Sequence, residues 1–257
     1  MWRRKKQTKI EYGLNVAGIP TTDTRHYPWY DDMIPVRMTK LTPDWFKKMK
    51  AHKSSSGENI PNLKVCPSFV NMMTEGYVIR NASILKISGV QRDGETVAEI
   101  STPIDGYISF HDEFMFADNF PFPKNHMHFS MKLQSPFGML PDREVHMVYL
   151  PCWWDENHNN IKAIHGYVRW NPSRALHINV NTFIRRPELG EEYYIPKGAP
   201  LVHILFVNPA DVKFVKNDKI NKTGEAIDAL NHATRYGVYG HLRNISENIK
   251  DFLVGKS

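Results

Sequence analysis

The sequence predicts a mainly β protein, a β-sandwich or jelly roll with an extended N-terminal arm and a helical C-terminal tail. Short apolar runs alternate with turn residues through the middle of the chain, at a spacing typical of sandwiches. Strand and helix patterns do not alternate there, which disfavours a parallel α/β fold. We therefore expect an arm and short helix over residues 1–65, a β-sandwich body over 66–210 and a tail over 211–257.

The first segment shows no clear helical or strand period over residues 1–30, which begin with basic side chains. We expect an extended arm that is either disordered or ordered only by lying on a partner. A short helix follows, because Thr42 is a suitable N-cap and Pro43 suits the first helical position. The Ser/Gly-rich residues 53–57 predict a loop at its end.

The body contains nine predicted strands, several of which alternate strictly between apolar and polar residues. Turn residues separate them, and Pro196 with Gly198 predicts a tight turn into a buried strand. One helical turn is expected at residues 67–73, before the first strand. The predicted strands are residues 76–80, 82–87, 96–100, 107–110, 127–133, 144–150, 164–170, 176–184 and 201–207.

The tail carries helical patterns over residues 223–233 and 242–253. In the second of these, Leu242, Ile245, Ile249 and Leu253 form one apolar stripe. The tail is expected either to pack on the sandwich or to dock a partner.

Length and composition exclude several classes of protein. A chain of 257 residues with 41% hydrophobic residues can bury a core without disulfides or metals. It has no apolar stretch of about 20 residues, so we expect no membrane span. The basic N-terminus is not followed by an apolar segment, so we expect no secretion by a signal peptide. Two cysteines exclude a disulfide framework and favour a reducing compartment.

The net charge of +6 is unevenly distributed. Residues 1–64 carry +7, residues 65–210 carry −3 and residues 211–257 carry +2. A nucleic-acid-binding domain would carry its positive charge on the folded body, which here is mildly acidic. This pattern argues against nucleic-acid binding, except through the basic N-terminal arm.

Twelve histidines make a metal site one alternative. His126 and His128 form an HxH pair, which on a strand would direct both rings to one face. With Glu113 or Asp112 as the carboxylate, they would suit Fe(II) or another divalent metal. The competing interpretation is that strand histidines face solvent and bind nothing, and we expect no cofactor on that interpretation.

Motifs for nucleophilic or phosphate chemistry are absent from the sequence. There is no Gly-x-Ser-x-Gly, P-loop or Gly-x-Gly-x-x-Gly. Cys66 and Cys152 are each expected to be buried filler, and Asp155 and Glu156 would raise the pKa of the Cys152 thiol. The sequence therefore favours a protein that is not an enzyme.

Two groups of residues are candidates for partner binding. The first is the basic N-terminal cluster, which could clamp phosphates or an acidic neighbour, and the second is a pair of adjacent tryptophans in the body. A tryptophan within a basic terminus favours docking over free exposure to solvent. The candidate residues are Trp2, Arg3, Arg4, Lys5, Lys6, Trp153 and Trp154.

Three segments in order, over about residues 34–207, resemble a family of uncharacterised tailed-bacteriophage proteins with bacterial relatives. They are Ile34-Pro-Val-Arg with Pro43-Asp-Trp-Phe-Lys-Lys-Met, Cys66-Pro-Ser-Phe-Val with Glu75-Gly-Tyr-Val-Ile, and Ser135-Pro-Phe-Gly with Tyr149-Leu-Pro and Ile195-Pro-Lys-Gly-Ala-Pro-Leu-Val-His-Ile-Leu-Phe-Val. The resemblance implies a cupin-like β-sandwich and a phage origin, and it implies no activity. The arm and tail look like additions to the family pattern.

The expected function is therefore that of a non-catalytic phage structural or binding protein. It would be a virion or assembly component in the virion or host cytoplasm, attached by its arm and tail to copies of itself or to other phage proteins. One alternative is a metal-dependent cupin-type enzyme resembling non-haem iron oxygenases. Another is a host-directed phage factor that binds a bacterial protein.

Overall fold

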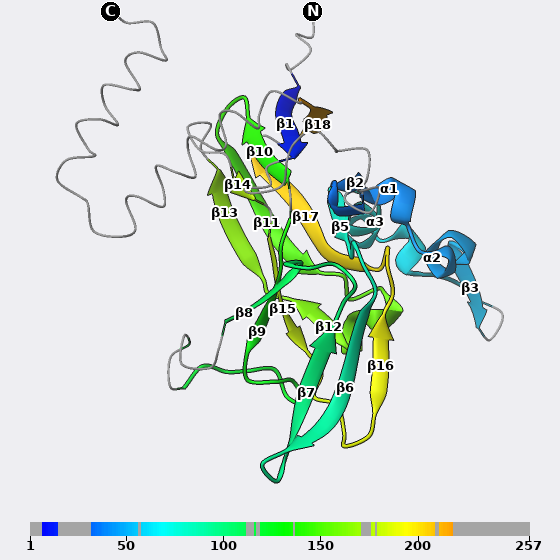
Figure 1. Cartoon of the computed structure of the whole chain (residues 1–257). Coiled ribbons are helices and arrows are strands. Elements are labelled where there is room, and N and C mark those ends of the chain that lie inside the picture. Colours follow the sequence, from blue (N-terminus) through cyan, green and yellow to red (C-terminus); the bar gives the residue numbers. More distant parts are fainter. Residues whose placement is uncertain are drawn as a thin grey trace, which may run out of the picture.

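The computed structural model describes residues 7–14, 32–55, 58–111, 116, 119–135, 137–170, 176–177, 179–208 and 211–217 (Figure 1). Over these residues the protein is mainly β, with several antiparallel sheets, as predicted. The strands are β1 (Thr8–Leu14), β2 (Val36–Arg37), β3 (His52–Ser55), β4 (Glu58–Pro61), β5 (Tyr77–Arg80), β6 (Leu85–Arg92), β7 (Glu95–Ser101), β8 (Ile108–His111), β9 (Ser130–Leu133), β10 (Phe137–Pro141), β11 (Val145–Pro151), β12 (Ile161–Ala163), β13 (Gly166–Trp170), β14 (Leu176–His177), β15 (Val180–Ile184), β16 (Glu192–Ile195), β17 (Pro200–Asn208) and β18 (Val212–Lys216). The helices are α1 (Met38–Leu41), α2 (Asp44–Lys48) and α3 (Pro67–Thr74), with short 3-10 helices η3 (Leu63–Val65) and η5 (Glu156–Asn159).

The five-stranded sheet β13-β11-β17-β5-β2 faces the four-stranded sheet β14-β10-β1-β18. Tyr77 of β5 bridges them: its ring centroid lies 5.0 Å from that of Phe214, and its hydroxyl donates to the Val212 carbonyl at 2.5 Å. A second four-stranded sheet, β12-β15-β9-β8, closes the main core at its other end. The three-stranded sheet β16-β6-β7 projects from the lower end of the molecule (Figure 1).

Each of the nine predicted strands is found, with shifted ends and with residues 176–184 divided between β14 and β15. The hairpin between β6 and β7 has a tight two-residue turn, in which Asp93 and Gly94 both have positive φ. The helix predicted at residues 67–73 is α3, which extends to Thr74. The helical tail predicted over 223–233 and 242–253 lies outside the described residues.

Strand β1 lies between two others, antiparallel to β10 and parallel to β18. Residues 8–14 were expected in the arm and residues 212–216 in the tail, but both segments are strands of a core sheet. Ile10 is fully buried. The alternation of Ile10, Tyr12 and Leu14 is too short to indicate a strand within a Gly- and Pro-containing segment.

Asn81, at the junction of β5 and β6, is completely buried and fully hydrogen-bonded through its side chain. Its Nδ2 donates to the carbonyls of Ile195 and Pro196 at 3.2 and 3.0 Å. Its Oδ1 accepts from the Tyr107 hydroxyl at 2.8 Å, and the same hydroxyl oxygen accepts the Ala82 N–H at 3.0 Å. One amide thereby joins the starts of β6 and β8 to the end of β16.

The turn between β16 and β17 is the tight turn predicted from Pro196 and Gly198. Gly198 has φ of +82°, where a side chain would be strained, and the Ala199 N–H donates to the Pro196 carbonyl at 3.2 Å. The turn is fixed to Asn81 by two backbone bonds, from Asn81 N–H to Ala199 and from Gly198 N–H back to Asn81. The strand that follows, β17, has buried residues from Leu201 to Ile204, as expected.

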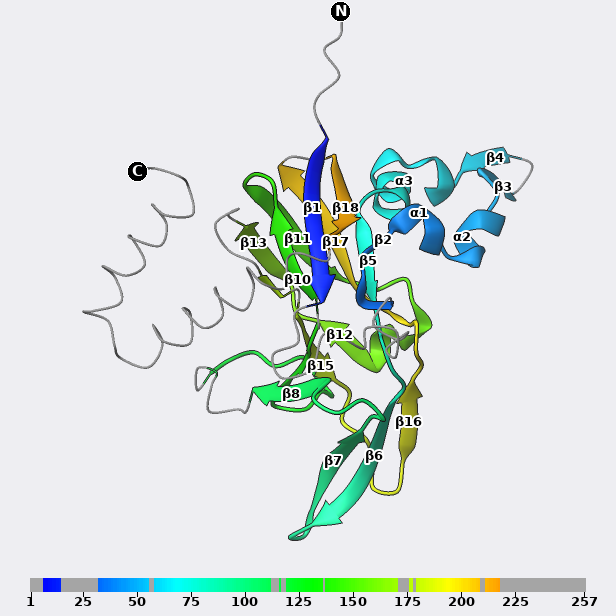
Figure 2. The same ribbon diagram turned by 45° about the horizontal axis from the view of Figure 1, so that its top comes forward.

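The helices α1, α2 and α3 pack on the outer face of the five-stranded sheet (Figure 2). A second, smaller core lies beneath them, formed by Met38, Phe46, Met73, Val78, Cys152 and Trp154. Thr42 does not cap α2 as predicted, and the N-cap is Pro43, without a side-chain bond. The Thr42 hydroxyl is instead directed at the carbonyls of Met38 and Met73, at 3.3 and 3.2 Å, which ties α1 to α3.

The loop predicted at residues 53–57 is partly replaced by a hairpin. His52–Ser55 forms β3, which pairs with β4. Serine-rich segments resemble loops because short polar side chains compete with backbone hydrogen bonds, but a neighbouring strand can supply those bonds instead.

Replacing Ile10 by Ala tests whether β1 belongs to the core. We expect the free energy of unfolding to fall by about 3 kcal/mol, because the side chain is fully buried and its removal leaves a cavity. Lys9→Ala, on the exposed face of the same strand, should change it by less than about 0.5 kcal/mol. Urea unfolding followed by circular dichroism measures both, and equal effects would contradict the assignment of β1 to the core.

Replacing Tyr107 by Phe tests the Asn81 junction. The variant leaves the Asn81 Oδ1 and the Ala82 N–H without their partner, at a cost of about 1–3 kcal/mol. Tyr194→Phe, at an exposed tyrosine, is the matched control and should have little effect. Thermal unfolding measures the melting temperature of both variants. A wild-type melting temperature for Tyr107→Phe would contradict a stabilising role of the junction.

Candidate partner-binding surface

Two tryptophans and a phenylalanine form an exposed aromatic surface above the second core. Trp45 of α2 is 41% exposed and Trp153, after β11, is 43% exposed. Phe69 of α3 lies between them, with ring centroids 6.3 Å from Trp45 and 5.7 Å from Trp153. We call Trp45, Phe69 and Trp153 the aromatic surface. Apolar side chains gathered at the surface of a soluble domain typically mark an interaction site.

The aromatic surface is held in place from below. The indole N–H of Trp45 donates to the Trp154 carbonyl at 3.4 Å, which connects α2 to the segment after β11. Phe46 contacts both Trp45 and Phe69, with ring centroids 5.9 and 5.7 Å away. Because Phe46 and Trp154 are themselves buried, the exposed rings rest on a fixed base and lose little entropy on binding.

An apolar hollow lies beside η3 on the same helical unit. It has a volume of about 720 Å³, is open to solvent and is lined by Met49, Ile60, Pro61, Asn62, Leu63, Val65 and Cys66. Ile60, Leu63 and Val65 are 44–53% exposed. The hollow therefore adds solvent-exposed apolar area to that of the aromatic surface.

Lysines surround these apolar side chains. Lys47, Lys48 and Lys50 are exposed at the end of α2, and Lys47 forms an exposed ion pair with Asp44 at 3.1 Å. Lys64 lies with its Nζ 4.0 Å from the Phe46 ring centroid and donates to the Phe46 carbonyl. From residue 38 to residue 75 the sequence has six lysines and three acidic residues. The surface is thus both apolar and basic.

The two cysteines differ in burial and in the direction in which the pKa of the thiol is shifted. Burial raises the pKa of the Cys152 thiol well above its usual value, with Asp155 adding to the effect, as expected. Cys66 is half-buried at the edge of the hollow, not fully buried, and the Ser68 hydroxyl and the Phe69 N–H lower the pKa of its thiol. The expectation of full burial was wrong for Cys66, because this residue is the N-cap of α3 and lines the open hollow.

The predicted partner-binding residues have different positions. Trp153 belongs to the aromatic surface, whereas Trp154 is 9% exposed and packs in the second core. The basic cluster Trp2, Arg3, Arg4, Lys5 and Lys6 lies outside the described residues, directly before β1. Trp45, Phe69 and the hollow were not predicted as binding residues, because their exposure depends on how α2 and α3 meet.

The histidines proposed as metal ligands have different surroundings. His126 is 4% exposed, with its Nδ1 2.9 Å from the Lys124 carbonyl. His128 is exposed, and its ring stacks on Phe122. The pair does not lie on a strand, so the expected shared face is not formed. Glu113 and Asp112 lie outside the described residues, within which no three His, Cys, Asp or Glu side chains gather as a metal site.

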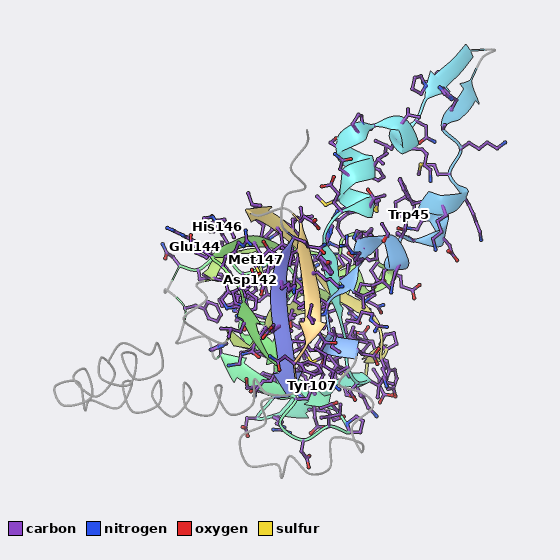
Figure 3. The ribbon with its side chains drawn as sticks, turned by 90° about the horizontal axis from the view of Figure 1, so that it is seen from above. Trp45, Tyr107, Asp142, Glu144, His146 and Met147 are labelled. Carbon is purple, nitrogen blue, oxygen red and sulfur yellow. The ribbon has the colours of Figure 1, made fainter. Side chains whose placement is uncertain are left out.

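A chain of polar side chains on the outer face of β11 and β13 has no counterpart in the sequence analysis. Glu144 Oε1 lies 2.6 Å from His146 Nε2, and His146 Nδ1 lies 2.8 Å from the Tyr167 hydroxyl. Arg169 donates to Glu144 at 3.2 Å. Glu144 and His146 lie far from Trp45 in Figure 3. The hollow is not lined by these residues.

No family model, curated protein or solved structure matches this chain. In the described part of the chain, none of the helices has the length and apolar character needed to cross a bilayer. The arrangement of side chains is therefore the basis for a functional proposal.

Burial lowers the pKa of His126, His158 and His203 below the ordinary value of 6.5. Lys162 acts in the same direction on His126 and His158. Near pH 6 the unfolded chain therefore binds more protons than the folded one, so stability should fall as pH decreases below 6.5.

Urea unfolding at about pH 7.5 and about pH 5.5 tests this expectation. His203→Gln should reduce the pH dependence, because an uncharged side chain replaces a buried titrating one. His165→Gln, at an exposed histidine, should leave it unchanged. A stability that rises on acidification would contradict the prediction.

Proposed function

We propose that this chain is a non-catalytic binding protein that docks an acidic, partly apolar protein segment on the aromatic surface and the hollow. The observation that carries the proposal is the pair of half-exposed tryptophans, Trp45 and Trp153, on either side of Phe69. Large aromatic side chains on a fixed base are the usual anchors of protein interfaces.

The exposed lysines favour an acidic partner. Lys47, Lys48 and Lys50 would attract a negatively charged segment and orient it, while the apolar side chains supply most of the affinity. An amphipathic helix with apolar residues on one face suits an open apolar groove of this kind. Nucleic acid is the weaker fit, because Asp155 and Glu156 follow Trp153 closely in the chain.

We propose in addition a cupin-like fold and a role in a bacteriophage. The facing sheets support a jelly roll of cupin-like form, and the resemblance to tailed-phage proteins supports a virion or assembly role. The partner would then be another phage protein or a second copy, with the arm and tail as further points of attachment.

A synthetic amphipathic peptide with leucine on one face and glutamate on the other tests the surface. We expect it to bind, to change tryptophan fluorescence and to slow the reaction of Cys66 with iodoacetamide, because Cys66 lines the hollow. Cys152 is buried, so it should contribute little to labelling. Binding should weaken as ionic strength rises, because exposed charges are screened.

Trp153→Ala should weaken peptide binding about ten-fold, in the range of an interface anchor. The charge-reversal variant Lys47→Glu, Lys48→Glu, Lys50→Glu should also weaken peptide binding when it is measured at low salt. Tyr167→Ala is the matched control, since Tyr167 is an exposed aromatic residue beside His146, which lies far from Trp45 (Figure 3). Equal binding of a peptide with lysine in place of glutamate, or wild-type affinity in Trp153→Ala, would refute the proposal.

A further inference from the structure

A recess of about 320 Å³ cuts into the main core between the five-stranded sheet and the sheet containing β12 and β15. Its innermost lining consists of Met147, Val180 and Val202, which are at most 1% exposed. The half-buried Tyr149 and Val168 form part of its walls. The other lining residues are Ala163, Ile164, His165, Gly166, Asn179 and Asn181.

The recess is separate from the aromatic surface. Along β11, Met147 and Tyr149 face inward, because Met147 belongs to the main core and Tyr149 packs against it. The alternating residue His146 contacts Tyr167 on the opposite face of the sheet. The helices pack over the outer side of β5 at Val78, so a ligand in the recess would touch neither Trp45 nor Trp153.

The recess has the composition of a small-molecule site. Protein pockets for small ligands are mainly apolar and contain a few polar groups that fix orientation. An apolar cavity of about 150 Å³ already accepts a benzene ring, so this recess can hold a ring with a substituent. None of the described residues that line it carries a permanent charge, which disfavours an ionic ligand.

Tyr149 supplies the polar group. Tyr149 lines the recess, and its ring packs against the main core. Burial raises the pKa of Tyr149, so the hydroxyl stays protonated and can donate. A hydroxyl in this position is matched by a ligand with a neutral acceptor, such as a carbonyl oxygen.

We infer that the recess binds a small, uncharged, mainly apolar ring compound whose carbonyl oxygen accepts a hydrogen bond from Tyr149. Met147, Val168 and Val202 would contact the ring. Asn181 and His165, both exposed, lie at the solvent side.

Ligand-detected NMR with benzamide tests the inference on the full chain, because benzamide combines a ring with a neutral carbonyl. We expect saturable binding of benzamide, with weaker binding of toluene, which lacks an acceptor, and of benzoate, which is charged. Tyr149→Phe should weaken benzamide binding about five-fold, the effect of one neutral hydrogen bond. Tyr167→Phe, on the opposite face of the same sheet, should leave it unchanged.

Val168→Phe adds a second test, because the larger ring should fill the recess and abolish binding. Circular dichroism would establish that each variant is folded, and Tyr149→Phe keeps the test decisive if Val168→Phe does not fold. Absence of benzamide binding by the wild type, an unchanged affinity in Tyr149→Phe, or preference for benzoate would overturn the inference.

Discussion

The structure depends on the buried side chain of Asn81. Its amide satisfies two carbonyls of one turn and one tyrosine hydroxyl, and each bond goes to a segment distant in sequence. A buried amide without partners would be costly, so these three segments must meet in one arrangement. Loss of the Tyr107 hydroxyl would leave the Asn81 Oδ1 unpaired. Loss of the Asn81 amide would leave the hydroxyl and the two carbonyls unpaired, with the same kind of free-energy cost. The junction therefore fixes where β5 ends and where β6, β8 and β17 begin.

The position of the aromatic surface depends indirectly on the Asn81 junction. Two residues separate α3 from β5, and β5 ends at Arg80, directly before Asn81, so the helices have a defined position beside this strand. Val78, on β5, provides the contact between the two cores, because it faces the helices while its neighbours Tyr77 and Ile79 face the main core. The surface is thus built on side chains whose positions are already fixed. Such preorganisation lowers the entropic cost of binding.

The strands of the body could be predicted because period-2 alternation and turn residues are local signals, as at Asp93-Gly94 and Pro196-Lys-Gly198. Strand β1 could not, since its burial arises from pairing with β10 and β18, which are more than a hundred residues away. Trp153 was predicted as a binding residue because it is one of two adjacent tryptophans, but the sequence does not distinguish it from the buried Trp154. Phe69 and the recess around Tyr149 depend on the packing of distant elements. No single-sequence pattern records that packing, and the same holds for the register that pairs His146 with Arg169 and brings Tyr167 within hydrogen-bond distance of His146.

The parallel pairing of β1 with β18 has a mechanical consequence. Thr8 lies opposite Val212 and Tyr12 opposite Lys216, so the chain enters the sheet at one end of this ladder and leaves it at the other. Tension applied between residues 7 and 217 would pull the two strands along their length in opposite directions. All hydrogen bonds of the ladder would then share the load in shear, and none would be opened one at a time. If the two ends are attached to different neighbours, this strand pair is the element that transmits force through the molecule.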